Sequence, residues 1–591
     1  MDAVNLTIDG LSVEVPRGST ILDAASKLGI DIPTLCHHPD LAVKAVCRVC
    51  VVEVEGQRVL QPACAYPVAE GMQVKTNTAR VREARKTVVE LMLAHHPQDC
   101  LQCERNQNCE LQSLAYRLGV REISFPYIER DLPIDELSPA MKRDPNKCIN
   151  CRRCVSVCHD IQGVGALESV NRGFDTVVTA PFWRSIAEIS CVTCGQCVLV
   201  CPVGAITERD DTEQVWAALA NPQKHVIVQT APAIRVSIGE ELGLPVGTRV
   251  TKKLTAALRR LGFDRVFDTD FSADLTIWEE GNELLHRLST GGTLPMLTSC
   301  SPGWIKYIEH YYPELLDHLS TCKSPQQMFG ALAKTYYAEK AGLDPADIVM
   351  VSIMPCTAKK FEAGRPEMSD SGYADVDVVL TTRELGRMLR EAGIDFSGLP
   401  EEEYDEPLGI STGAGAIFGA SGGVMEAALR TVYELVTGKE LENVNFEDVR
   451  GLEGIKSATV SLPIPEAAAA GDKATNNGVS ELEVKVAVAH SLQHAKTLME
   501  QIRAGKAEYQ FIEVMCCPGG CIGGGGQPIP TNTEERTLRI KAIYEEDAGM
   551  PLRKSHDNPA VKTLYKEYLG KPLGEKSHQL LHTHYEPREK F

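Results

Sequence analysis

Hydrophobic and polar residues alternate along the first part of the chain, as they do in half-buried strands. Residues 4–15 read VNLTIDGLSVEV, two alternating runs separated by Asp9 and Gly10, which predicts a β-hairpin. A helical spacing of apolar residues follows over 19–28, beginning at a Ser-Thr pair that can cap a helix. The pattern therefore predicts a small β-rich domain over residues 1–80.

The hydrophobic pattern changes in the second part of the chain. Apolar runs at 225–230 (HVIVQT) and 347–354 (DIVMVSIM) are typical of buried strands, and they alternate with helical patterns such as 424–437. We therefore expect α/β architecture over residues 211–530. The segment 466–479 is rich in Ala, Gly and Asn, which predicts a surface loop.

Length and charge narrow the class of protein. A chain of 591 residues is too long for one core, so several domains are expected. The net charge of −19 argues against a nucleic-acid partner, because binding phosphate needs a basic surface. No apolar run reaches the length of a membrane span, and the N-terminus has no secretory signal, so we expect a cytoplasmic protein.

Cysteine is the most informative residue, because the chain has 21 and needs no disulfides to replace a core. Most of the cysteines lie in tight groups in the first third of the sequence. The first group follows the predicted hairpin and helix, and its spacing suits four thiolates around a 2Fe–2S cluster; zinc is the alternative. Its members are Cys36, Cys47, Cys50 and Cys64.

The second group follows an amphipathic helix predicted at 81–95. It has the spacing H-x3-C-x2-C-x5-C and consists of His96, Cys100, Cys103 and Cys109. Three thiols and one imidazole could hold zinc or a 4Fe–4S cluster. The adjacent His95 is an alternative ligand.

Two further groups repeat the spacing C-x2-C-x2-C-x3-C. They are Cys148, Cys151, Cys154 and Cys158, then Cys191, Cys194, Cys197 and Cys201. Bacterial ferredoxins have this pattern, and in them the fourth cysteine of each run binds the cluster of the other run. Zinc sites separate their cysteine pairs by longer stretches, so two 4Fe–4S clusters are strongly favoured. Four clusters in succession suit a conduit for electrons.

Three distant segments place the remaining cysteines in turns rich in Gly and Pro. They read TSCSPGW (298–304), MPCTAKKFE (354–362) and EVMCCPGGCIGGGGQP (513–528). Backbone amides in such turns can approach an inorganic cluster closely. Together the segments could supply four thiolates to one enclosed site.

These segments resemble the three signature motifs of the FeFe (iron-only) hydrogenases. The resemblance continues through QTAPAIR (229–235), KSPQQMFGA (323–331) and RKSHDNPAVKTLY (553–565). It implies a multidomain α+β and α/β protein. Its parts would be a β-grasp 2Fe–2S domain (1–80), a 4Fe–4S domain with one histidine and three cysteine ligands (81–125), a bacterial-type ferredoxin domain with two 4Fe–4S clusters (138–210), an α/β H-cluster domain (211–530) and a fused small-subunit-like segment (531–591).

The family carries an H-cluster, which is a 4Fe–4S cubane joined through one cysteine to a diiron unit with carbonyl, cyanide and dithiolate ligands. The resemblance implies that Cys356, Cys517 and Cys521 bind the cubane, that Cys521 also bridges to the diiron unit, and that Lys359 stabilises a cyanide ligand. The implied lining of the diiron pocket is Ala231, Pro232, Gln326, Met354, Phe418 and Met515.

One position departs from the family pattern. The first motif usually has two adjacent cysteines, of which the first relays protons and the second binds the cubane. Here they are Cys300 and Ser301, and serine is the poorer iron ligand. Ser301 could bind through oxygen, Cys300 could shift into the ligand position, or the additional Cys516 could supply the thiol. Loss of the H-cluster is the remaining alternative.

The resemblance also implies a proton relay. Its members would be Cys300, Glu280, Ser320, Glu283 and Arg287. The two carboxylates and the arginine lie on one face of a helix expected over 274–288. Without the resemblance, the Glu283–Arg287 pair reads as a surface ion pair and Cys322 as a buried structural thiol.

We therefore expect an enzyme that interconverts hydrogen with protons and electrons. The glycine spacing at 413–419 does not match a dinucleotide loop, so a flavin- and NAD(P)-binding partner and a small 2Fe–2S subunit are expected, with ferredoxin as a further candidate partner. Maturation factors would assemble the H-cluster. The rival functions are a hydrogen sensor and a non-catalytic electron-transfer subunit resembling part of NADH dehydrogenase.

Overall fold

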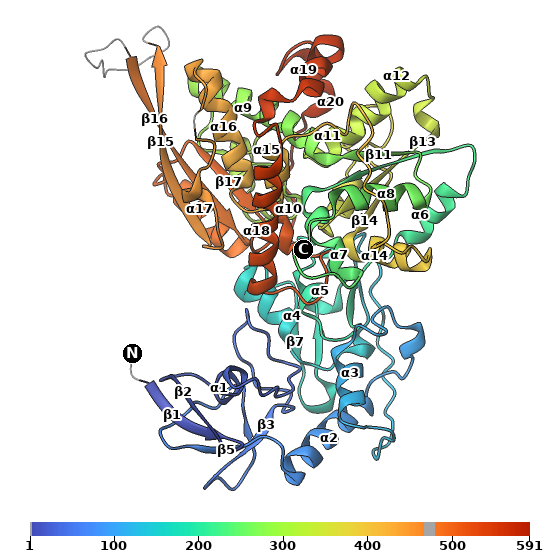
Figure 1. Cartoon of the computed structure of the whole chain (residues 1–591), viewed down its shortest axis with the longest axis vertical. Helices are drawn as coiled ribbons and strands as arrows, with labels where there is room; N and C mark the ends of the chain where they lie inside the picture. The colour runs from blue at the N-terminus through green and yellow to red at the C-terminus, as the bar shows by residue number, and fades with distance from the viewer. Residues whose placement is uncertain (1–2, 442, 466–478, 591) are drawn as a thin grey trace. The chain divides into compact units, whose positions relative to one another are not determined.

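The computed structural model describes residues 3–441, 443–465 and 479–590 (Figure 1). The loop predicted at 466–479 lies outside the described residues, except for Val479. The chain forms two compact units. The first comprises 1–160, 165–189 and 200–207, and the second 161–164, 190–199 and 208–591. No helix in the described ranges is long and apolar enough to cross a membrane.

The first unit begins with a five-stranded sheet of order β2-β1-β5-β3-β4. Its strands are β1 (Ala3–Ile8), β2 (Leu11–Pro16), β3 (Val51–Val54), β4 (Gln61–Pro62) and β5 (Gln73–Lys75). The first two strands form the predicted hairpin, with Asp9 and Gly10 both at positive φ in the turn. The Thr20 hydroxyl caps α1 (Ile21–Lys27), which packs its apolar side against the sheet.

The cysteine-rich part of the first unit is built from short elements. They are α2 (Ala79–Leu93), α3 (Glu110–Arg117), α4 (Arg153–Ser156) and the strand pairs β6 (Met141–Arg143) with β9 (Ile206–Glu208) and β7 (Glu168–Val170) with β8 (Val177–Thr179). The helix predicted at 81–95 is confirmed as α2, two residues earlier in the chain. Buried Arg85 on this helix donates to the carbonyl of Val51 at 2.8 Å, which ties α2 to the sheet.

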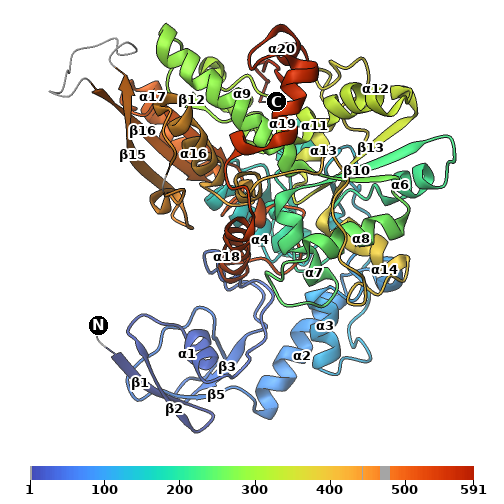
Figure 2. The ribbon, with the colours of Figure 1, turned by 45° about the horizontal axis from the view of Figure 1, so that its top comes forward.

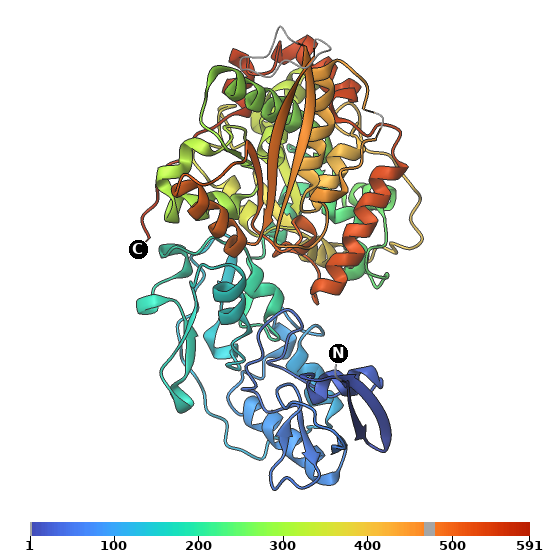
Figure 3. The same ribbon diagram turned by 90° about the vertical axis from the view of Figure 1, so that its left-hand side faces the viewer.

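The second unit contains two four-stranded sheets. The first has the order β11-β10-β13-β14 and is parallel throughout; its strands are β10 (His225–Thr230), β11 (Arg265–Asp268), β13 (Ile348–Met354) and β14 (Val378–Thr381). The second has the order β12-β17-β16-β15, from β12 (Met296–Leu297), β17 (Phe511–Met515), β16 (Val479–His490) and β15 (Ile455–Pro465). β15 and β16 pair antiparallel, whereas the other neighbours in this sheet are parallel. β15 and β16 are the two long orange strands in Figure 3.

Helices surround both sheets of this unit. They include α8 (Thr251–Leu261), α9 (Thr269–Thr290), α10 (Pro302–Tyr311), α11 (Pro325–Leu332), α13 (Ala358–Ala363), α14 (Thr382–Glu391), α16 (Gly423–Thr437), α17 (Leu492–Arg503), α18 (Thr533–Gly549), α19 (Pro559–Leu564) and α20 (Glu575–Leu581). Figure 2 shows α9, α16 and α19 close together. The first half of α9 is buried on all sides, because α11, α15 (Gly413–Ala416) and α16 all pack against it. The expected α/β architecture is confirmed, including the strand at 225–230 and the helix at 424–437.

Candidate catalytic and iron–sulfur sites

The cysteine motifs of the second unit follow parallel strands that end at a common place. Ala231 follows β10, Cys300 follows β12, Cys356 follows β13 and Cys517 follows β17. Ligands in α/β proteins bind beyond the carboxyl ends of parallel strands, because the loops that leave the sheet converge there. Two sheets therefore direct four loops to one place in the second unit.

These loops enclose a largely apolar cavity. The predicted thiols and pocket residues all line it, namely Ala231, Pro232, Cys300, Ser301, Gln326, Met354, Cys356, Lys359, Phe418, Met515, Cys516, Cys517 and Cys521. Every one of the residues proposed for the H-cluster pocket thus faces the same space. Thr269 and Ala273 of α9 line it as well and were missed from the sequence. Their spacing from Glu280 on the same helix could have identified them.

The chemistry of the lining fits a metal cluster. Burial, reinforced by the neighbouring Cys517 thiol, raises the pKa of Cys521 to about 12, and burial also raises the pKa of Cys356. Thiolates so close together in an apolar cavity need a cationic centre to balance their negative charge. The side-chain oxygen of buried Gln326 has no hydrogen-bond partner within the described residues, so it is available to a bound group.

A glycine turn makes room for the last thiol. Gly520 has φ 91°, and a Cβ there would lie 2.6 Å from the backbone nitrogen of Ser421. Only glycine therefore fits at this position between Cys517 and Cys521. This turn lets both thiols reach the cavity from one short segment.

Lys359 is held at the edge of the cavity by defined partners. Its Nζ donates to the carbonyl of Cys300 at 3.1 Å and pairs with Glu362 at 2.9 Å. The Glu362 carboxylate also accepts hydrogen bonds from Gln326 and Ser324. This network fixes a cation beside the cavity, as the resemblance implies for Lys359.

Ser301 and Cys516, the two unusual positions of the motifs, are in contact. The backbone N–H of Cys516 donates to Ser301 Oγ at 3.2 Å. The Cys516 thiol is buried and hydrogen-bonds with the thiols of both Cys194 and Cys517. A Cβ on Gly303 would lie 2.7 Å from Cys516 Sγ, so the glycine of the TSCSPGW motif makes room for this thiol.

Hydrogen bonds connect four groups of the predicted proton relay, namely Glu280, Ser320, Glu283 and Arg287. Burial, and then the adjacent Glu283 carboxylate, raises the pKa of Glu280 to about 8, and Glu280 hydrogen-bonds with Ser320. The Ser320 hydroxyl donates to Glu283 at 3.1 Å, and Arg287 Nη2 pairs with Glu283 at 2.6 Å. Cys300 lies within electrostatic reach of Glu280, and burial raises the pKa of its thiol.

One alternative from the sequence is wrong. The Glu283–Arg287 pair is not a surface ion pair, because the two side chains are only 9% and 12% exposed. Helix spacing alone could not reveal this burial, which the segments around 320 and 582 produce. Cys322 is fully buried, as expected.

In the first unit, the first cysteine group converges on one point. The Cys36 thiol hydrogen-bonds with the thiols of Cys47 and Cys64, and Cys50 hydrogen-bonds with Cys64. Hydrogen bonds from Cys47 and Cys64 lower the pKa of Cys36. Four thiols brought together in this way form a ready-made metal site.

The histidine-containing group is more open. His96 is buried, with Nδ1 unpartnered among the described atoms, and burial lowers the pKa of its imidazole, which keeps a lone pair available. Cys103 packs against Gly204, and Cys100 is exposed. His95 stacks on Phe174 and directs Nδ1 to the carbonyl of Leu91. His95 Nε2 is likewise without a partner among the described residues, so each of the two histidines keeps one ring nitrogen available for a metal.

The ferredoxin-like runs interleave as their spacing predicts. One cavity of the first unit is lined by Cys148, Cys151 and Cys154 of the first run together with Cys201 of the second. Burial raises the pKa of Cys148 to about 11. The other three cysteines of the second run lie in the second unit: Cys191 and Cys194 precede α5 (Gln196–Val200), and Cys197 is part of it.

Comparison with known families agrees with this division of sites. Residues 224–525 match the iron-only hydrogenase large subunit, C-terminal domain, and 533–588 match the iron hydrogenase small subunit. The N-terminal matches are a 2Fe–2S iron–sulfur cluster binding domain (1–79), the NADH-ubiquinone oxidoreductase-G iron–sulfur binding region (85–124) and a 4Fe–4S dicluster domain (146–205).

Individual proteins show the same likeness. The chain is 53% identical to the NADP-reducing hydrogenase subunit HndD of Solidesulfovibrio fructosivorans over the full length of both, and 40% identical to iron hydrogenase 1 of Clostridium pasteurianum over 98% of this chain and 99% of that one. It resembles the structure of an apo FeFe-hydrogenase HydA1 variant from Chlamydomonas reinhardtii with a TM-score of 0.58 and 47% identity, over 64% of this chain and all of that one. The chain therefore belongs to the iron-only (FeFe) hydrogenases and is an enzyme of that family with additional iron–sulfur domains.

Proposed function

We propose that this chain reversibly oxidises hydrogen at an H-cluster held by Cys356, Cys517 and Cys521. The observation that carries the proposal is the convergence of these three thiols, from two distant motifs, on one buried cavity. When bound, the cluster supplies the heterolytic cleavage of hydrogen. The apolar lining keeps water away from the reacting atoms, which protects reactive intermediates.

The residues around the cavity then handle the proton. Cys300 takes it at the cavity wall. Glu280, whose buried carboxyl is protonated near neutral pH, gives its own proton to Ser320 and accepts the one from Cys300. Ser320 passes it to Glu283, whose carboxylate is held in place by Arg287. Each step joins two groups that can exchange a proton. The cation of Lys359 beside the cavity orients and stabilises anionic ligands of the bound cluster.

Electrons would leave through one 2Fe–2S cluster and three 4Fe–4S clusters held by the N-terminal cysteine groups. The likeness to a NADP-reducing hydrogenase subunit supports transfer of the electrons to NADP through a further subunit. A flavin- and NAD(P)-binding subunit and a small 2Fe–2S subunit would be the partners. Ferredoxin is a second candidate partner. Maturation factors would install the diiron unit.

We further propose that Cys516 replaces the thiol missing at position 301 and supplies the fourth cubane ligand. Its side chain contacts that of Cys517, and its backbone contacts Ser301. Thiolate binds iron–sulfur clusters better than a serine hydroxyl does. Cys300 remains free for the proton relay in this arrangement.

The two rival functions predict different properties. A pure electron-transfer subunit needs no metal site after residue 210, yet the cavity there is lined by five cysteines. A hydrogen sensor would keep the cavity but turn over hydrogen very slowly. Catalytic rate therefore separates the sensor from the proposed enzyme.

The test is hydrogen oxidation by protein that has been matured with the diiron unit, with methyl viologen as electron acceptor. The wild type should turn over, and Cys521→Ala should be inactive because it removes a thiol that would hold the H-cluster. The 2Fe–2S signal from the first cysteine group should be equal in both proteins and serves as the folding control. Activity that survives in Cys521→Ala would contradict the proposal.

A further inference from the structure

Glu283 is the meeting point of two groups of side chains, and one of them has no role so far. On the first side, Arg287 donates to Glu283 and also to the carbonyl of Leu319 at 2.6 Å. The guanidinium stays protonated at any physiological pH. Arg287 can therefore hold the carboxylate in place, but it cannot pass a proton onward by losing one.

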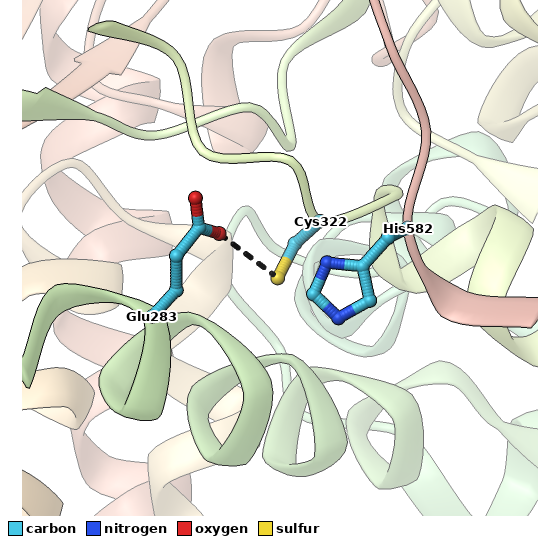
Figure 4. A group of neighbouring side chains, drawn as sticks. All are labelled: Glu283, Cys322 and His582. Carbon is cyan, nitrogen blue, oxygen red and sulfur yellow. Dashed lines mark hydrogen bonds between the residues drawn. The ribbon is translucent and has the colours of Figure 1, made fainter. Parts of the chain in front are cut away.

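The other side of Glu283 leads to a histidine. The backbone N–H and the hydroxyl of Thr321 lie 3.1 and 3.2 Å from Glu283 Oε2. The same hydroxyl lies 2.8 Å from His582 Nδ1. Figure 4 shows Glu283, Cys322 and His582 facing one another across this space. Thr321 thus joins the last carboxylate of the relay to an imidazole.

His582 is brought here by the C-terminal segment that follows α20. Two backbone hydrogen bonds clamp that segment to the strand-like stretch around Cys322: Thr583 N–H donates to the carbonyl of Thr321 at 2.7 Å, and Lys323 N–H donates to that of Leu581 at 2.8 Å. The small-subunit-like segment therefore contributes a side chain to the proton-handling region.

His582 is placed to hold an exchangeable proton. Its Nε2 lies 3.2 Å from Glu279 Oε2, and the Glu279 carboxylate also accepts from the hydroxyl of Tyr565 and the N–H of Leu573. When the Thr321 hydroxyl donates to Glu283, both ring nitrogens of His582 face acceptors. Nδ1 of His582 accepts from the Thr321 hydroxyl or donates to it, according to how that hydroxyl rotates, so a proton can pass between these two atoms.

The route from His582 continues outward. Its ring centroid lies 4.4 Å from that of His578, which is exposed on α20. Burial lowers the pKa of His578, so this imidazole is mostly neutral near pH 7 and can accept a proton. The titratable groups that face His582 are Glu279 and Glu283 of α9, Cys322, Tyr565 and His578.

The side chains of Glu283, Cys322 and His582 could alternatively form a metal site, because one ligand atom of each lies within 4.8 Å of the others. Hydrogen bonds already engage these atoms. Both oxygens of Glu283 accept from neighbours, and both nitrogens of His582 have partners. The Cys322 thiol in turn donates weakly to Glu283 at 3.9 Å. Proton exchange fits these contacts better than metal binding.

We propose that Thr321 and His582 form a second proton branch that connects Glu283 with the surface at His578. In the outward step, protonated Glu283 gives its proton to the Thr321 oxygen while the Thr321 hydroxyl gives its own to His582 Nδ1. The Nε2 proton of His582 is then released toward Glu279 or His578, which leaves a neutral ring with its proton on Nδ1. The ring accepts the next proton at Nδ1 after it has exchanged back to the Nε2–H tautomer. The branch rests on the proposed relay through Glu280, Ser320 and Glu283.

Substitutions at Thr321 and His582 in the full-length, matured protein test the branch. Thr321→Val keeps the shape and removes the hydroxyl, and we expect it to slow hydrogen evolution from reduced methyl viologen roughly tenfold or more, with a larger solvent isotope effect. Thr321→Ser is the matched variant and should recover most of the lost rate. His582→Gln should behave like Thr321→Val. Equal iron content and circular dichroism exclude misfolding.

A second readout does not depend on turnover. The infrared band of the protonated Glu280 carboxyl, assigned by its absence in Glu280→Gln, shifts after transfer into D2O at the rate of proton exchange with solvent. Thr321→Val and His582→Gln should slow that shift, and Thr321→Ser should not. The branch would be wrong, and the relay would stand, if Thr321→Val and His582→Gln both kept wild-type rates of turnover and exchange while Glu283→Gln lost turnover and exchange. Wild-type turnover in Glu283→Gln would overturn the relay and the branch together.

Discussion

The backbone N–H of Cys516 donates a 3.2 Å hydrogen bond to Oγ of Ser301. Ser301 stands where the family has a ligating cysteine, and Cys516 is the additional cysteine of this chain. These two positions are thus in contact. The number of thiols around the cavity is therefore preserved, although they come from different segments. This relationship makes the ligand set of the cubane testable by substitution.

If Cys516 is the fourth ligand, Cys516→Ala should lose or convert the cubane of the catalytic domain. The expected sign is a three-iron signal in Mössbauer and electron paramagnetic resonance spectra, with the accessory clusters intact. Ser301→Ala is the matched control and should leave the cubane unchanged. The opposite result, an intact cubane in Cys516→Ala and a damaged one in Ser301→Ala, would show that serine is the ligand.

The buried carboxyl of Glu280 should make stability depend on pH. Burial raises its pKa from 4.5 to about 8, so the folded protein binds a proton that the unfolded chain releases between these values. The contribution of the protonated Glu280 carboxyl to the free energy of unfolding is present in full below pH 4.5 and is lost as the pH rises through about 8. The midpoint temperature of unfolding should therefore decrease as the pH rises from 4.5 to about 8, and the decrease should be smaller in Glu280→Gln.

Burial also raises the pKa of Asp274, to about 7. This second carboxyl makes stability depend on pH in both the wild type and Glu280→Gln. The comparison therefore concerns the difference in slope between wild type and variant. An identical slope in the two would show that Glu280 is ionised in the folded protein at neutral pH.

A buried charge cluster ties the small-subunit-like segment to the catalytic domain. Fully buried Arg430 on α16 pairs with Glu426 at 2.7 Å and with Asp547 of α18 at 2.9 Å. Arg430→Met leaves buried carboxylates short of a partner and should cost about 3 kcal/mol in the free energy of unfolding. Lys541→Met removes an exposed pair with Glu545 and should change it by less than about 0.5 kcal/mol. Equal effects in urea titrations would contradict this assignment.

The shared cavity of Cys148, Cys151, Cys154 and Cys201 makes a specific prediction about cluster content. Cys201→Ala should damage the cluster of the first ferredoxin-like run, although Cys201 belongs to the second run by sequence. Iron analysis combined with electron paramagnetic resonance should show one 4Fe–4S signal lost. Retention of both signals of the pair would disprove the interleaved arrangement.

Local patterns predicted the elements well, because hairpins, buried strands and amphipathic helices depend on residues close in sequence. The hairpin at 4–15, the strand at 225–230 and the helix at 424–437 all occur. Motif spacing likewise identified the thiols that line the two cavities.

Local sequence patterns could not predict contacts between segments that are distant in the chain. Glu283 and Arg287 are four residues apart on α9, and their spacing is the same whether the pair is exposed or covered. Their burial depends on segments around residues 320 and 582 that only the folded chain brings together. The contacts of Cys516 with Cys194, and of Thr321 with His582, were hidden for the same reason.

An H-cluster in the cavity of the second unit would carry carbonyl and cyanide ligands that absorb in the infrared. The decisive measurement is infrared spectroscopy of protein matured with the diiron unit, with iron analysis of the same sample. We expect bands of iron-bound carbonyl and cyanide and about twenty iron atoms per chain. Accessory-cluster iron without those bands, in a properly matured sample, would contradict the presence of an H-cluster.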